Sequence, residues 1–116
     1  MNLTNIKSMF TLFSGNADVE ECEPVIELAV IEVENMILES ADKNDARLDY
    51  LCAAIANFRY YQAMTAQDRS AYTYGGRLID DSDGKILGFA EGLLKGYFRL
   101  CSDIIKGSDF VFIGAA

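Results

Sequence analysis

Residues 47–60 read RLDYLCAAIANFRY and place apolar side chains on more than one side of a helix. One stripe has helical spacing and consists of Leu48, Leu51, Cys52, Ile55 and Phe58. A second side carries Tyr50, Ala54 and Tyr61. A helix that is apolar on several sides is packed by neighbours on more than one face. The sequence therefore predicts a central helix over about residues 46–66 and a mostly α fold around it.

Two helices are predicted before this central one. The first covers about residues 4–13, has one apolar face, and ends at the turn residues Ser14-Gly15-Asn16. The second begins with Asp18 as N-cap and Glu21 three residues later, as in a capping box, and runs to about Ser40. Its apolar stripe consists of Cys22, Ile26, Ala29, Val33 and Met36.

The pattern breaks after the central helix. Residues from about 67 to 83 predict a short hairpin or loop around the turn signal Gly75-Gly76. A fourth helix follows from about Asp83 to Lys106, with its inward side formed by Ile86, Ala90, Leu93, Tyr97, Leu100 and Ile104. The apolar tail, 110–113, is strand-like. The prediction is one domain, 1–116: a small bundle of about four helices with a hairpin or loop and a strand-like C-terminal tail.

Composition excludes several classes of protein. No stretch approaches about 20 consecutive apolar residues, so no membrane span is expected. The N-terminus lacks a basic patch followed by a long apolar run, so a signal peptide is not expected either. Three cysteines, Cys22, Cys52 and Cys101, are far apart, and the chain has no histidine to activate a thiol. We therefore expect buried thiols that act as small hydrophobic side chains.

Negative charge is concentrated in one segment. The net charge is −8, and between residues 8 and 42 there are nine acids and no Lys or Arg. Such a block disfavours nucleic acid as a direct ligand, because phosphate is repelled. It favours a basic protein partner, or a surface past which DNA slides without binding. A solvated helix face that aids solubility explains it equally well. The candidate acidic face consists of Glu20, Glu23, Glu27 and Glu34.

No motif indicates catalysis. The sequence has no nucleophile elbow, P-loop, dinucleotide fingerprint or metal-ligand spacing. The run from Asp80 to Gly84 resembles part of a calcium loop, but Ile79 and Ala90 stand where an EF-hand needs acidic ligands. A turn followed by an N-cap explains the same residues. We expect no enzymatic activity, no cofactor and no metal.

Glycine recurs at every fourth residue of the predicted last helix, at Gly84, Gly88, Gly92 and Gly96. Each interior glycine lowers the stability of a helix by about 0.5–1 kcal/mol relative to alanine. We therefore expect this row of four glycines, the glycine ridge, to have a structural role. We favour close packing of this ridge against alanines of the central helix, namely Ala53, Ala56 and Ala63. The alternative is a groove for a neighbouring subunit, in which Gly88, Gly92 and Gly96 would form the contact.

A Gly-containing loop, a last long helix and the tail Asp109-Phe110-Val111-Phe112 follow the stretch 47–60 in this order. In this order, and in its placement of alanine and aromatic residues, the sequence resembles the helical head–tail connector (head-completion) proteins encoded in tailed-phage and prophage morphogenesis modules. The similarity covers about 70 residues, from Asp45 onward. The acidic second helix, preceded by a short first one, also lies where that family has its leading helices.

The resemblance implies a structural protein that docks under the portal as a ring of identical subunits. Its partners would be itself, the portal protein and the next neck or tail protein, and DNA would pass without specific binding. It would reside in the virion, and in the host cytoplasm before assembly. The resemblance also implies contacts made by the loop at Tyr74, Gly75 and Gly76, and by the tail at Phe110 and Phe112.

The sequence departs from this family at the loop, which is usually a single Gly-Asp turn. Here the double glycine is followed by Asp80-Asp81-Ser82-Asp83, which leaves the partner of the loop open. The alternative function is a small acidic helical adaptor or regulator that binds a basic protein partner.

Overall fold

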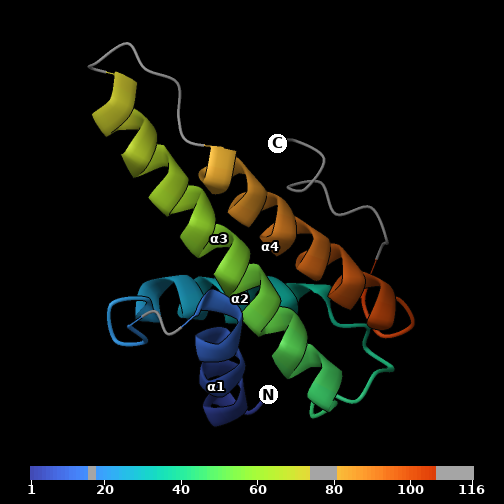
Figure 1. The fold of residues 1–116 in the computed structure, drawn as a ribbon. Helices are drawn as coiled ribbons and strands as arrows, with labels where there is room; N and C mark the ends of the chain where they lie inside the picture. Colours follow the sequence, from blue (N-terminus) through green and yellow to red (C-terminus); the bar gives the residue numbers. More distant parts are fainter. Residues whose placement is uncertain (16–17, 74–80, 107–116) are drawn as a thin grey trace.

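Four helices form the described part of the fold (Figure 1). The computed structural model describes residues 1–15, 18–73 and 81–106, and the side chains of all of these except 67–73 and 81–84. The helices are α1 (Leu3–Ser14), α2 (Glu23–Met36), α3 (Ala46–Thr73) and α4 (Asp81–Leu100). The prediction of a small, mostly helical bundle is confirmed.

The long helix α3 is the centre of the molecule. Its 28 residues span about 42 Å at 1.5 Å per residue. Every residue from 51 to 58 is buried, which is possible only when neighbours cover all sides of the helix. Within the described residues, each extensive contact between two helices involves α3. The central helix predicted from residues 47–60 is therefore confirmed.

The predicted end of this helix was wrong. We expected a hairpin or loop over about 67–83, but residues 67–73 continue α3, and residues 81–83 already belong to α4. No glycine or proline interrupts the sequence between Ala46 and Thr73, so the backbone hydrogen bonds of the helix can continue. The centre of the expected hairpin, residues 74–80, lies outside the described part of the chain.

Helix α1 is closed at both ends by local hydrogen bonds. The Asn2 side chain accepts from the backbone N–H groups of Thr4 and Asn5, at 3.0 and 3.3 Å. At the other end, Gly15 adopts a left-handed conformation with φ 72° and terminates the helix. Between these caps, Ile6 and Phe10 are fully buried, and the Phe10 ring meets the edge of Tyr60 on α3. The predicted first helix is thus confirmed and ends at Gly15, and Asn16 of the predicted turn lies outside the described residues.

Helix α2 is shorter than predicted at both ends. Asp18 caps a turn by accepting from the Glu20 N–H at 3.0 Å, and the helix itself begins only at Glu23. It ends at Met36 because Ile37 is extended and forms an antiparallel bridge with Ile105. The flanking bonds are Leu38 N–H to the Ile104 carbonyl (3.0 Å) and Lys106 N–H to the Met36 carbonyl (2.6 Å). A non-local pairing therefore replaces the last predicted turn.

The buried face of helix α4 was only partly predicted, with Ala90 and Ile104 buried as expected, and its end was predicted wrongly. The buried side chains are Ala90, Leu94, Phe98 and Cys101. Of the residues expected inward, Ile86 and Leu100 are 41% and 49% exposed, and Leu93 and Tyr97 are only partly buried. The helix ends at Leu100, whose carbonyl accepts from Arg47 Nη1 at 3.0 Å. Ile104 is buried, but it lies in the turn that follows.

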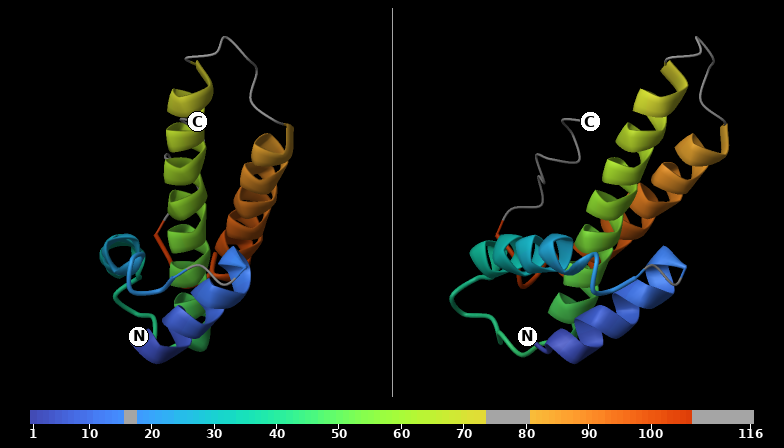
Figure 2. Two further views of the ribbon diagram at one scale, coloured as in Figure 1. Left: turned by 60° about the vertical axis from the view of Figure 1, so that its left-hand side comes forward. Right: turned by 90° about the vertical axis from the view of Figure 1, so that its left-hand side faces the viewer.

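The two outer helices occupy different sides of α3. Helix α4 runs back alongside α3, whereas α2 crosses α3, and the left view of Figure 2 shows α3 between them. Each outer helix buries one stripe and leaves its opposite face without a partner in the described structure. No helix among the described residues has the length and apolar character to cross a membrane.

Candidate protein interfaces

The glycine ridge of α4 faces solvent. Gly88, Gly92 and Gly96 are exposed, and a Cβ atom added at any of them would meet no atom within 4 Å. Ala53 and Ala56, expected to pack against this ridge, are buried elsewhere, and Ala63 is exposed. The prediction of close packing against α3 was therefore wrong. Three glycines, each of which lowers the stability of the helix relative to alanine, therefore lie on a face of α4 that no described residue covers.

Apolar side chains lie next to the ridge. Phe89 is 78% exposed and is the most exposed large apolar side chain among the described residues. At 3.6 residues per turn, Leu93 lies one turn after Phe89 on the same side of the ridge, with Ile86 next to them, and Leu100 continues the line of the ridge one turn after Gly96. Removing an exposed phenyl ring from water is favourable, so this edge of α4 is suited to contact with another protein.

A small groove opens between α1, α3 and α4 beside Phe89. Its volume is about 140 Å³, and its apolar lining consists of Phe13, Tyr61, Ile86, Phe89, Ala90 and Leu93. Asn57 of α3 also lines this groove and is only 2% exposed. Its Oδ1 atom is buried and accepts no hydrogen bond. An unsatisfied buried acceptor costs about 1–3 kcal/mol, and none of the described residues donates to this one.

Two positive side chains, Lys95 and Arg99, border the ridge on its other side, and a third, Lys85, lies one turn before Phe89 on the apolar side. Lys85, Lys95 and Arg99 are exposed. Lys95 pairs with Glu91 at 3.0 Å, one helical turn away. In the part of the chain that the structure describes, Lys85 and Arg99 form no ion pair. The outer face of α4 thus combines glycines with an apolar edge and a cationic edge.

The outer face of α2 has the opposite charge. The four predicted acidic residues, Glu20, Glu23, Glu27 and Glu34, are all exposed. Leu28 and Ile31 lie beside Glu27 and Glu34 and are 58% and 55% exposed. Glu23 makes a loose pair with Lys7 at 3.7 Å, whereas Glu27 and Glu34 pair with no described cation. The structure therefore adds an apolar stripe to the acidic face that the sequence indicated.

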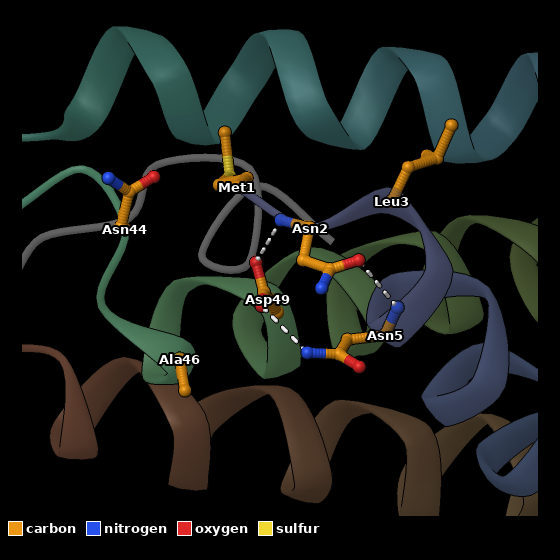
Figure 3. A pocket seen from close by; sticks show the side chains of 7 residues that line it. All are labelled: Met1, Asn2, Leu3, Asn5, Asn44, Ala46 and Asp49. Atoms are coloured by element: carbon orange, nitrogen blue, oxygen red, sulfur yellow. Dashed lines mark hydrogen bonds between the residues drawn. The ribbon is translucent and has the colours of Figure 1, made fainter.

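A second hollow lies where the N-terminus meets the start of α3 (Figure 3). It is open, has a volume of about 560 Å³, and contains the buried carboxylate of Asp49. The Asn2 N–H donates to Asp49 Oδ1 at 3.0 Å, and Asn5 Nδ2 donates to Oδ2 at 3.5 Å (Figure 3). Both carboxylate oxygens are therefore engaged in attaching α1 to α3, unlike the free acceptor of Asn57.

The three thiols are buried, as predicted. Cys52 and Cys101 are fully buried and Cys22 is 5% exposed. Burial raises the pKa of Cys52 to about 12 and that of Cys101 to about 11. The Cys22 pKa is also raised, first by burial and then by Glu21 and Asp18. A thiol that stays protonated is a poor nucleophile, so these side chains contribute packing.

Several predicted contact residues lie outside the described part of the chain. These are Tyr74, Gly75 and Gly76 of the loop, and Phe110 and Phe112 of the tail. The structure describes no side chain from Asp80 to Gly84 either. Elsewhere in the described chain, no group of three or more acidic or sulfur side chains is placed to hold a metal ion.

Asn57, Phe89, Leu28 and Ile31 were missed by sequence reasoning. Phe89 and the two α2 residues are apolar and were left unassigned, although they fall off the buried stripes of their helices. Comparisons with protein-family models, with curated proteins and with solved structures gave no match. The function must therefore be argued from the surfaces described above.

Proposed function

We propose that this chain is a non-catalytic structural protein of a phage or prophage neck, which forms a ring under the portal and joins head to tail around the DNA channel. The observation that carries the proposal is the outer face of α4. Three glycines and a 78% exposed Phe89 occupy a face that has no partner within the described chain. Such a face is suited to contact with an identical subunit or with a neighbouring protein.

The acidic face of α2 agrees with a neck location. DNA carries one negative charge per about 1.7 Å of helix axis, so a carboxylate surface repels it and does not hold it. Glu20 and Glu23, just before and at the start of α2, are exposed members of this acidic face. A ring that lines or borders a DNA passage benefits from such a surface, because the DNA must move through without binding.

Deletion of the coding sequence tests this function. After induction of the deletion strain, we expect heads that have packaged DNA and separate tails that fail to join. Negative-stain electron microscopy of the lysate checks this result. Expression of the intact chain from a plasmid should restore joined particles. Complete, infectious particles formed in its absence would contradict the proposal.

The second candidate function is an acidic adaptor that binds a basic protein. It is favoured by the unpaired Glu27 and Glu34, flanked by Leu28 and Ile31. This function uses α2 alone and leaves the face of α4 unexplained. Capture of one basic host protein by α2, lost in a Glu27→Lys, Glu34→Lys variant and unaffected by changes on α4, would favour the adaptor over the neck protein.

A further inference from the structure

Two exposed faces of this chain are complementary to each other in chemistry. On α2, the apolar stripe of Leu28 and Ile31 lies beside the carboxylates of Glu27 and Glu34. On α4, Phe89 and its apolar neighbours lie on one side of the glycine ridge, while Lys95 and Arg99 border the other side. Each face therefore consists of an apolar strip next to a charged strip, and the two charges are opposite.

The two faces cannot meet within one molecule. Helices α2 and α4 pack on different sides of α3, and their outer faces both point away from it (Figure 2). Contact between them requires two molecules. Because the faces differ, the contact is head-to-tail, and it leaves one free face of each kind to bind a further copy.

We propose that the outer face of α2 in one copy of this chain docks on the outer face of α4 in the next, across the ridge of Gly88, Gly92 and Gly96. This inference rests on the proposed function, and it specifies which surfaces join the subunits of the ring. Leu28 and Ile31 meet Phe89 and the mouth of the groove beside it, and Glu27 and Glu34 meet the cations of α4. The glycines let the α2 helix approach the α4 backbone closely.

The groove beside Phe89 provides independent support. Asn57 lines this groove and its buried Oδ1 has no hydrogen-bond partner, so an N–H or O–H donor in the groove can satisfy it once the Asn57 amide turns toward the opening. Asn35 is exposed on α2, one turn beyond Ile31, and its side-chain amide carries such a donor. The stripe that supplies the apolar contacts therefore also supplies a group that can satisfy Asn57.

Charge disfavours the symmetric alternative. If α4 packed against α4 of a second copy, the unpaired Lys85 and Arg99 would enter the same contact as the Lys85 and Arg99 side chains of that copy. Like charges placed opposite each other disfavour such a pairing. Two α2 faces would bring their glutamates together in the same way. Only the pairing of α2 with α4 puts opposite charges in contact.

The test uses two full-length double variants. The first, Glu27→Lys with Glu34→Lys, makes both faces positive. The second, Lys85→Glu with Arg99→Glu, makes both faces negative. Sedimentation velocity at low salt should show self-association of the wild type, and the dissociation constant of each variant alone should be at least about tenfold higher. An equimolar mixture of the two variants should associate again, because each positive face then meets a negative one.

Matched controls change the same number of charges elsewhere. Glu21→Lys with Glu39→Lys alters exposed acids outside α2, and Lys43→Glu with Lys106→Glu alters exposed cations outside α4. Both controls should associate like the wild type. Asn57→Leu removes the unsatisfied acceptor from the groove without changing charge. It should leave the fold intact and weaken association several-fold.

Three outcomes would overturn the inference. The first is self-association of the Glu27→Lys, Glu34→Lys variant with the dissociation constant of the wild type. This is the result expected if α4 pairs with α4, because that contact does not involve α2. The second is a mixture that stays as dissociated as its two components. The third is a wild type that remains monomeric up to about 1 mM, the weak end of specific association. The neck function is judged separately, because the deletion phenotype does not depend on which faces join the subunits.

Discussion

At the scale of single residues, the buried thiols predict how stability depends on pH. In the unfolded chain a thiol has a pKa of about 8.5, whereas burial raises the pKa to about 12 for Cys52 and about 11 for Cys101. The contribution of each thiol is therefore fully present below about pH 8.5 and is lost as the pH rises toward the folded-state pKa. At about pH 10 the loss is about 2 kcal/mol per thiol.

Urea unfolding at pH 7 and about pH 10 measures this loss. A Cys52→Ala, Cys101→Ala variant is the control, since it lacks the titrating groups while keeping the rest of the core. Between pH 7 and about pH 10, the free energy of unfolding of this variant should fall by about 4 kcal/mol less than that of the wild type. Equal losses in the two proteins would show that the thiols do not remain protonated in the folded state.

The sequence predicted the burial of single residues better than it predicted the candidate site. The thiols could be placed in the core because each one falls on an apolar helical stripe. Asn57 was not identified, because a polar residue is ordinarily assigned to the surface. The available signal was its position between Ala56 and Phe58, inside a run that is buried on all sides. A polar residue in such a run must either find a partner or remain unsatisfied.

At the scale of helices, the glycines of α4 predict opposite effects on folding and on assembly. Alanine at Gly88 and Gly92 has open space around its Cβ atom, so each change should raise the free energy of unfolding by about 0.5–1 kcal/mol. The same changes thicken the ridge that we propose as a contact. Thermal unfolding of the dilute chain should therefore occur at a higher temperature, while self-association weakens.

Gly15→Ala is the matched comparison. Gly15 has φ 72° at the end of α1, where an L side chain costs about 1–2 kcal/mol. That variant should be less stable than the wild type and should associate normally when folded. If alanine at Gly88 or Gly92 also destabilised the chain, the ridge would be packed inside the molecule, contrary to the exposed position found here.

Helix boundaries and faces were only partly predictable, because contacts distant in sequence decide them. Nothing near Met36 ends α2; the helix stops because Ile37 pairs with Ile105. In α4, Leu93 and Leu94 are adjacent and belong to two competing apolar stripes. Packing against α3 selects the stripe that contains Leu94 and Phe98. Helical periodicity therefore identified each helix, while the tertiary partner determined its buried face and its end.

At the scale of the whole molecule, the central position of α3 followed from residues 47–60, but the arrangement of its neighbours did not. Apolar side chains around a whole helix require partners on every side, and the structure provides α1, α2 and α4. Which side each of them takes depends on crossing geometry that no local pattern encodes. The two complementary outer faces, and with them the proposed head-to-tail contact, become visible only in the assembled fold.

The central claim is that many copies of this chain are built into each particle as a ring. The most direct test is its copy number in purified particles, measured by mass spectrometry against isotope-labelled peptides of this chain and of the portal protein. A ring requires several copies per particle, in a fixed ratio to the portal protein. Complete tailed particles that lack the chain, or that contain at most one copy, would contradict it.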